Sequence, residues 1–272
     1  MYIYILVKME GRRCFRCRFR RNLVSNSQLV SIIMPTYNSA VTISESIESV
    51  LTQTYTNWEL LITDDLSTDN SEEVVNEYTK KDNRIKLFSL GENGGAGKAR
   101  NNSIKHANGR FIAFLDSDDI WLPQKLEIQI SFMLDNNYAF TYTAYQKFIS
   151  EEDLGIVIPP SSITYNRLLY SNVIGCLTAI YDTAYVGKQY MPLIRKRQDM
   201  GLWLNILKII PKAYCLNEVL AKYRIDSGMS QDKLSAVKYQ WEFYRNVVGL
   251  GFFRSLFVFS EYAFKGYLKS KK

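Results

Sequence analysis

Strand and helix patterns alternate between Val30 and Leu115, and this alternation restricts the possible folds more than any other feature of the chain. Short apolar runs predict four strands, over 30–34, 58–63, 85–89 and 111–115. Helices are expected between them, and the first begins with the capping box Thr42-x-x-Glu45. Such a series requires a doubly wound, mostly parallel central sheet with right-handed crossovers and helices on both faces. The fold class is therefore α/β.

The fourth predicted strand ends in three carboxylates, those of Asp116, Asp118 and Asp119. Ligands of open α/β sheets bind beyond the carboxyl ends of the strands, so these acids are expected in a functional site. Hard oxygen ligands favour Mg²⁺ or Mn²⁺, and such an ion would most naturally hold a diphosphate. The alternative, from this segment alone, is an acidic turn that caps the helix beginning near Pro123.

Two further polar clusters follow strands of the same sheet, and parallel strands bring them to one edge. The cluster 35–38 follows the first strand, and the cluster 64–69 follows the second. A glycine-rich loop at 91–97 then starts a helix, and its amides together with the helix dipole are expected to favour an anion. The loop lacks the residue order of a Walker loop or a dinucleotide fingerprint, so neither an ATPase nor an NAD enzyme is indicated.

The positive charge of the chain is concentrated at its ends. Residues 1–21 and 233–272 each carry a net charge of +6, whereas residues 22–232 carry −5. An acidic body with basic, aromatic-rich ends argues against nucleic-acid binding and for contact with an anionic membrane surface. No stretch reaches the roughly 18 apolar residues of a spanning helix, so a peripheral protein is expected. The pair Cys14 and Cys17 has no second pair to complete a zinc site, and such cysteine usage suits a reducing cytoplasm.

Patterns in the second half of the chain are weaker. Helices are predicted over 124–136 and 199–210, strands over 140–145 and 219–224, and one or two aromatic-rich amphipathic helices over 232–272, with a break at 249–251. The last segment is expected to lie in a membrane interface, with its basic residues among the head groups. Its aromatic side chains could instead cover the sheet or a dimer partner. We expect a chain that ends near Ser230 to keep its fold.

Four motifs occur in the order and spacing of a known family. They are Pro35-Thr-Tyr-Asn38, Thr63-Asp-Asp-Leu-Ser-Thr-Asp69, Asn93-Gly-Gly-Ala-Gly-Lys-Ala-Arg-Asn101 and Asp116-Ser-Asp-Asp119. Over residues 29–225 the chain resembles the family 2 glycosyltransferases of the GT-A fold. The resemblance implies a nucleotide-binding half at 29–122 and an acceptor half at 123–225, between a basic N-terminal extension at 1–28 and a C-terminal helical tail at 226–272. It also implies a UDP-sugar donor, Mg²⁺ or Mn²⁺, and inversion at the anomeric carbon.

The resemblance assigns roles to residues at the sheet edge. It implies that Tyr37 lies against the uracil, that Asp65 accepts the N3–H of the uracil, and that Arg100 supports the base and Asp65. Asp118 would ligate the metal ion, with Asp119 near it in a lesser role. The remaining residues expected to bind the nucleotide sugar are Pro35, Thr36, Asn38, Asp116, Ser117 and Arg224.

A catalytic base is implied by the segment Arg197-Gln-Asp-Met-Gly-Leu-Trp203, which is similar to the family's x-E-D-x-x-L-W motif. Asp199 falls on the base, while Gln198 replaces the usual Glu. The alternative for Asp199 is an N-cap of its own helix. A later family motif, Y-R-x-H, ends here in Asp226 in place of His, which makes contact between this loop and the diphosphate uncertain.

Together these features favour a non-processive, bacterial-type enzyme of surface polysaccharide or O-antigen synthesis. We expect it to add one hexose or N-acetylhexosamine to a lipid-linked oligosaccharide, at the inner face of the plasma membrane and without nucleic acid, and a homodimer is possible. A sugar-nucleotide pyrophosphorylase would show G-G-x-G-x-R after the first strand, where this chain has Pro35-Thr-Tyr-Asn38. The rival from another class is an inactive membrane-surface or nucleic-acid-binding protein with the same fold.

Overall fold

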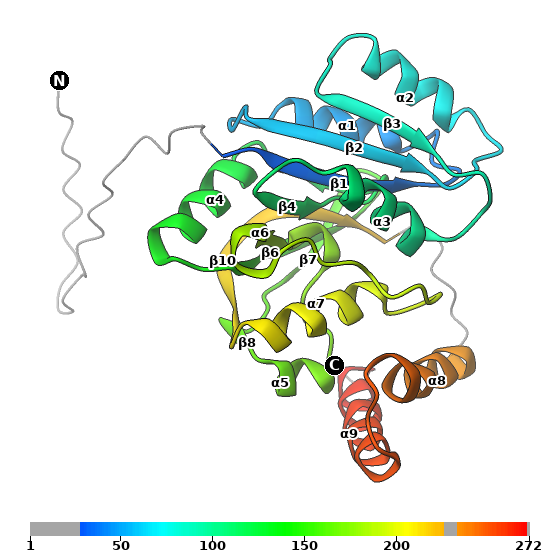
Figure 1. Ribbon diagram of the computed structural model, residues 1–272, viewed down its shortest axis with the longest axis vertical. Helices are drawn as coiled ribbons and strands as arrows, with labels where there is room; N and C mark the ends of the chain where they lie inside the picture. The colour runs from blue at the N-terminus through cyan, green and yellow to red at the C-terminus, as the bar shows by residue number, and fades with distance from the viewer. Residues whose placement is uncertain (1–27, 226–232, 271–272) are drawn as a thin grey trace.

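The computed structural model describes residues 28–225 and 233–270, and Figure 1 shows their arrangement. Expectations for the basic extension up to residue 27, for Cys14 and Cys17, and for Asp226 lie outside the described residues. Within the described ranges, no helix combines the length and the apolar character that crossing a membrane requires.

One mixed sheet forms the centre of the molecule, in the order β3-β2-β1-β4-β9-β6-β10-β5. The strands along this path are β1 (Val30–Thr36), β2 (Trp58–Asp64), β3 (Ile85–Ser89), β4 (Phe111–Phe114), β5 (Ile120–Trp121), β6 (Phe140–Ile149), β9 (Ile180–Asp182) and β10 (Ala213–Arg224), and two further strands pair with β6 and β10. Strands β1 to β4 pair in parallel, and so do β6 and β10. Strand β9 runs antiparallel to both β4 and β6, so it joins two parallel blocks that point the same way. The mostly parallel α/β fold is confirmed.

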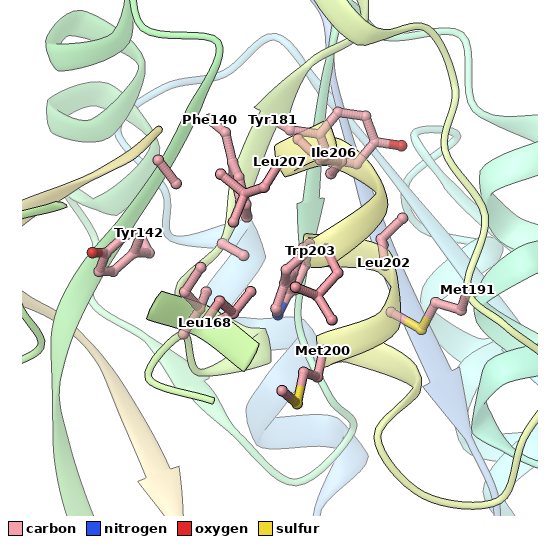
Figure 2. Packing of buried hydrophobic residues seen from close by; sticks show 14 of the residues in the cluster. Phe140, Tyr142, Leu168, Tyr181, Met191, Met200, Leu202, Trp203, Ile206 and Leu207 are labelled. Atoms are coloured by element: carbon pink, nitrogen blue, oxygen red, sulfur yellow. The ribbon is translucent and has the colours of Figure 1, made fainter. Parts of the chain in front are cut away.

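Helices cover both faces of this sheet (Figure 1). They are α1 (Ile43–Leu51), α2 (Ser71–Thr79), α3 (Ala96–His106), α4 (Lys125–Asn136), α5 (Tyr165–Leu169), α6 (Thr183–Val186) and α7 (Gln198–Ile209). Successive side chains of a strand point to opposite faces. Accordingly, Ile32 of β1 packs in the cluster with α1 and α4, whereas Ile33 packs in the cluster with α3 and α7. Figure 2 shows the second cluster around Trp203, whose indole lies edge-on to Phe114 at 5.3 Å between ring centroids.

Several short elements between β6 and α7 have no clear sequence pattern. They are β7 (Glu152–Val157), β8 (Ser162–Ile163), the 3₁₀ turn η1 (Cys176–Thr178) and β9. Strand β7 is almost entirely exposed, so it lacks the apolar alternation of a half-buried strand. Strand β9 has three residues and is buried throughout, which is too short a run to show a period.

The predicted capping box at the start of α1 is wrong in its mechanism. Thr42 is the N-cap residue, but its side chain makes no capping hydrogen bond. Its hydroxyl donates to the Ser117 carbonyl at 2.9 Å, and Glu45 forms an ion pair with Arg224. Both side chains therefore connect α1 to the strand ends that carry the predicted site.

The C-terminal segment forms α8 (Lys233–Glu242), the π turn η2 (Phe243–Val247) and α9 (Phe252–Ser270), on the side of the molecule away from β3 and α2 (Figure 1). The break at 249–251 is confirmed, and Gly249 there has a φ of 74°. Phe243 and Tyr244 are buried in the cluster around Trp203, which is the main core of the molecule. The Tyr244 hydroxyl donates to the Leu169 carbonyl at 2.6 Å. A chain ending near Ser230 would lose these buried side chains, so this packing argues against the expectation that such a chain keeps its fold.

Replacing Phe243 by Ala should destabilise the protein by about 3–5 kcal/mol, because the change leaves a cavity in the main core. The free energy of unfolding, measured by urea titration of the full chain, checks this. Phe253→Ala is the matched control, since Phe253 is 84% exposed, and it should change the stability by less than about 0.5 kcal/mol. Equal effects of the two substitutions would contradict the packing described for η2.

Candidate active site

A cleft of about 1410 Å³ opens beyond the carboxyl ends of β1, β2 and β4. Six of the residues predicted from the sequence line it: Tyr37, Asp65, Arg100, Asp116, Asp119 and Asp199. The cleft thus joins the strand ends of the first half of the chain to the start of α7. The other predicted residues do not line the cleft but belong to the strand ends and turns next to it. They are Pro35, Thr36, Asn38, Ser117, Asp118 and Arg224.

The end of β1 is held in place by its polar neighbours. Pro35 and Thr36 are the last two residues of the strand and are buried. Asn38 has a φ of 49°. Its side-chain oxygen accepts a hydrogen bond from the Thr68 backbone amide at 2.8 Å, and its backbone amide donates to the Ser67 hydroxyl at 2.9 Å. Asn38 therefore fixes the turn, while Tyr37 remains 50% exposed at the cleft.

The glycine-rich loop binds an anion that belongs to the chain itself. The two carboxylate oxygens of Asp65 accept hydrogen bonds from the amides of Gly94 and Gly95, at 2.7 Å each. Gly95 has a φ of 81°, a conformation that favours glycine. Lys98 forms an ion pair with Glu92 at 2.5 Å. The anion expected at this loop is therefore Asp65, which the loop holds with its carboxylate in the wall of the cleft.

Arg100 has a different acid partner from the one that the resemblance implied. Its guanidinium forms an ion pair with Asp116, not with Asp65, and also lies 3.4 Å from the side-chain oxygen of Gln198. Burial alone would lower the pKa of this guanidinium, but the charge of Asp116 raises it above its ordinary value. Arg100 thus carries a fixed positive charge between the acidic turn after β4 and the start of α7.

Arg224 does not line the cleft, but its hydrogen bonds hold the acidic turn at residues 116–119 in place. The Arg224 guanidinium donates to the Asp118 carbonyl at 2.8 Å, and its backbone amide donates to the Asp119 carboxylate at 3.0 Å. The Ser117 hydroxyl donates to the Ser39 hydroxyl at 2.9 Å. Burial, and then the charges of Asp116 and Asp118, raise the pKa of the Asp119 carboxyl well above its ordinary value.

Asp199 lies in the first turn of α7 and lines the cleft. The N-cap residue of this helix is Arg197, so the alternative role of Asp199 as an N-cap is wrong. One carboxylate oxygen of Asp199 accepts a hydrogen bond from the Asn172 side chain at 2.7 Å. This bond fixes the orientation of a carboxylate that faces the cleft, which is the arrangement that a general base requires.

The profile of glycosyl transferase family 2 matches residues 31–184, more than half of the chain. The chain belongs to glycosyl transferase family 2. This glycosyltransferase is 41% identical over 239 residues to TuaG of Bacillus subtilis, whose name assigns it to teichuronic acid biosynthesis, covering 86% of this chain and 94% of TuaG. It is 48% identical over 217 residues to Escherichia coli WfgD, named a UDP-Glc:alpha-D-GlcNAc-diphosphoundecaprenol beta-1,3-glucosyltransferase, covering 79% and 84% of the two chains.

Two solved structures share the fold. S. aureus TarS 1–349 in complex with UDP-GlcNAc superposes with a TM-score of 0.67 at 22% identity, over 86% of this chain and 71% of that TarS fragment. The mannosyltransferase PcManGT from Pyrobaculum calidifontis, in complex with GDP-Man and Mn²⁺, superposes with a TM-score of 0.60 at 17% identity. The match covers 82% of this chain and 64% of PcManGT. The GT-A architecture expected for this glycosyltransferase is therefore confirmed.

The acidic turn of the glycosyltransferase fits a divalent ion that is shared with a substrate. Among residues 28–225 and 233–270, no three His, Cys, Asp or Glu side chains gather into a complete metal site. A Mg²⁺ ion commonly needs only one or two carboxylates, because phosphate oxygens and water supply its other ligands. One oxygen of the buried Asp119 has no hydrogen-bond partner, and three acids lie within four positions, so the turn has negative charge to share with a cation.

Some residues of the site could not be predicted from the sequence. Asn172 lies in a loop without a motif, and only the fold brings it to Asp199. Gln198 donates to the Ile194 carbonyl at 2.6 Å and accepts from Arg100, so its amide bridges α3 to the loop before α7. A Glu, usual at this position in the resemblance, could not make the donated bond.

Proposed function

We propose that this glycosyltransferase transfers one glucose from UDP-glucose to a hydroxyl of an N-acetylglucosamine carried on a lipid diphosphate. The proposal is supported by the 48% identity of this chain to WfgD, whose name describes this reaction. The main structural support for this reaction is the position of the Asp199 carboxylate. Asn172 orients it in a cleft that Tyr37 and Asp65 also line. More broadly, the donor is a UDP-sugar carrying a hexose or an N-acetylhexosamine.

We infer that Asp199 removes the proton of the acceptor hydroxyl as its oxygen attacks the anomeric carbon. UDP departs from the opposite face, so the configuration at that carbon inverts. A β-linked product from an α-linked nucleotide sugar has this stereochemistry, and the name of WfgD specifies a beta-1,3 linkage. The hydrogen bond from Asn172 leaves one oxygen of Asp199 available to take the proton.

The donor half of the proposal uses the strand ends. Tyr37 stacks on the uracil and Asp65, held by the loop amides, accepts its N3–H. Asp118 is the residue proposed to ligate Mg²⁺ or Mn²⁺, because it falls on the metal ligand of the family motif and lies beside Asp119, which has one buried carboxylate oxygen without a hydrogen-bond partner. The chemistry that such an ion supplies is neutralisation of the charge that builds on the departing diphosphate.

We further propose that the protein works at the inner face of the plasma membrane, attached through α9. Four large side chains at the start of this helix, Phe252, Phe253, Leu256 and Phe257, are at least half exposed, and we call them the α9 apolar patch. The segment 233–272 also carries a net charge of +6, which favours anionic head groups. A lipid-linked acceptor requires the enzyme at such a surface. The alternative to a membrane is that a second copy of the chain covers the α9 apolar patch.

The double substitution Phe253→Ser and Phe257→Ser should reduce binding to anionic vesicles by more than tenfold, because each buried Phe contributes about 1.5–3 kcal/mol. Sedimentation with vesicles at low salt measures this. Ile209→Ser is the control, since Ile209 is also half exposed but lies at the end of α7. Unchanged vesicle binding, together with a loss of dimer in size-exclusion chromatography, would assign the patch to a partner copy instead.

A panel of nucleotide sugars tests the donor directly. With Mn²⁺ present, UDP-glucose should raise the thermal unfolding temperature more than UDP-galactose, UDP-N-acetylglucosamine or GDP-mannose, because binding to the folded state alone adds stability. Stabilisation by GDP-mannose and not by UDP-glucose would overturn the donor assignment. Consumption of UDP-glucose also separates this enzyme from an inactive binding protein of the same fold.

A further inference from the structure

Three consecutive basic residues, Arg195, Lys196 and Arg197, line the cleft directly before α7, and we call them the basic rim. Arg195 is exposed, while the other two are half-buried. Asp199, the proposed base, follows the rim by two residues. Four residues of extended chain span at most about 14 Å, so the Cα atoms of all three rim residues lie within that distance of the Asp199 Cα atom.

The other cations that line the cleft are neutralised by neighbouring acids. Lys98 forms an ion pair with Glu92, and Arg100 forms one with Asp116. Arg195 forms no ion pair within the described residues, so this end of the basic rim adds positive charge on the side of the cleft where the proposed reaction takes place. Positive charge of this kind attracts a phosphate, and Arg matches its geometry through paired N–H donors.

The tail helices hold the basic rim in place. The Arg197 guanidinium donates to the Tyr262 hydroxyl of α9 and lies 5.5 Å from the centre of its ring. Lys196 lies 5.2 Å from the centre of the Tyr239 ring of α8. Arg197 also adopts a φ of 70°. This conformation is unfavourable for any residue with a Cβ atom, and such strained residues cluster at functional sites. The tail that carries the α9 apolar patch thus also positions the rim.

We propose that the basic rim binds the diphosphate of the lipid-linked acceptor, an inference that rests on the proposed function. In an acceptor with a single sugar, one ring carries both the attacking hydroxyl and the diphosphate. When that hydroxyl lies at Asp199, the diphosphate must lie within one sugar ring of it, which is the neighbourhood of the basic rim. The lipid chain then continues toward the surface that bears the α9 apolar patch.

The test compares Arg195→Ala with the wild-type chain, using UDP-glucose and a synthetic α-D-GlcNAc diphosphate with a short alkyl chain in neutral detergent. Arg195 is chosen because, among the residues that the structure describes, no hydrogen bond or ring contact joins it to the tail helices, unlike Arg197. We expect the KM for this acceptor to rise about tenfold, the effect of losing a charged hydrogen bond. The KM for UDP-glucose should not change. Lys212→Ala, which removes an exposed charge beyond the far end of α7, is the control and should leave both constants unchanged.

The same acceptor without its diphosphate provides the second arm, and on it Arg195→Ala and wild type should perform equally. Neutral detergent contains no anionic head groups, so a persisting effect excludes a lipid head group as the ligand. An equal rise in the KM for UDP-glucose, or no change in either constant, would overturn the inference while the proposed function stands. If wild type transfers no sugar to either acceptor, the proposed function itself fails, and this inference fails with it.

Discussion

An Asp199→Asn variant is expected to bind UDP-glucose normally and to transfer it about 10²- to 10⁴-fold more slowly than the wild type, the range that general base catalysis commonly contributes. The amide has the shape of the carboxylate, and its oxygen can still accept the hydrogen bond from Asn172. It cannot take the proton of the acceptor hydroxyl. The loss should therefore appear in kcat, with the KM for UDP-glucose unchanged.

Single-turnover transfer to the acceptor measures this prediction, with Asn172→Ala as a comparison. Removing Asn172 frees the carboxylate to rotate but leaves it able to accept a proton, so its loss of rate should be smaller. Near-normal transfer by a folded Asp199→Asn protein would contradict the assignment of the base. A weaker binding of UDP-glucose would instead place Asp199 in donor recognition.

An Asp118→Ala variant should lose the part of UDP-glucose binding that depends on Mn²⁺, while its fold remains intact. Calorimetric titration of UDP-glucose with and without Mn²⁺ measures this dependence. Without the metal ion, the variant should be at least as stable as wild type, because the charge of Asp118 contributes to the raised pKa of the neighbouring Asp119. Removing one of several like charges relieves their repulsion.

Asp135→Ala is the matched control for Asp118→Ala. Asp135 is an exposed acid of α4 that does not line the cleft, so its loss should change neither donor binding nor the response to Mn²⁺. Equal Mn²⁺ dependence in Asp118→Ala and wild type would show that the metal ion, if one is used, has other ligands.

The regular part of the fold could be predicted because local patterns determine it. The apolar runs at 30–34 and 111–115 are buried on both faces, as parallel strands covered by helices require. Residues 152–163 could not be placed in this way, because an exposed strand and a two-residue strand show no alternation. The position of β8 depends on pairing with β10, which is distant in sequence, whereas β7 pairs with the neighbouring β6 through an irregular register.

The candidate site shows the same division. Its strand-end residues follow from sequence order, but their partners come from other segments. Thr42 and Glu45 have the spacing of a helix cap, yet the fold directs them to Ser117 and Arg224. Asp65 meets the glycine amides, and Arg100 meets Asp116, only after the strands are assembled.

The C-terminal tail shows why aromatic content alone was ambiguous. Phe243 and Tyr244 are buried in the core, whereas Phe252 and Phe253 are more than half exposed. Sequence alone predicts an amphipathic helix in both cases. Only the tertiary contacts separate the aromatic side chains that stabilise the body from those available to a membrane.

The proposal that this glycosyltransferase makes a β-linked glucose on a lipid-diphosphate N-acetylglucosamine can be tested by identifying one product. Wild-type enzyme, UDP-glucose, Mn²⁺ and the synthetic α-D-GlcNAc diphosphate acceptor would be incubated, and the product analysed by mass spectrometry and proton NMR of the new anomeric centre. We expect one added hexose with a β anomeric coupling, and no product when Mn²⁺ is replaced by a chelator. An α-linked product would contradict inversion at Asp199, and full activity without a divalent ion would contradict the role proposed for Asp118.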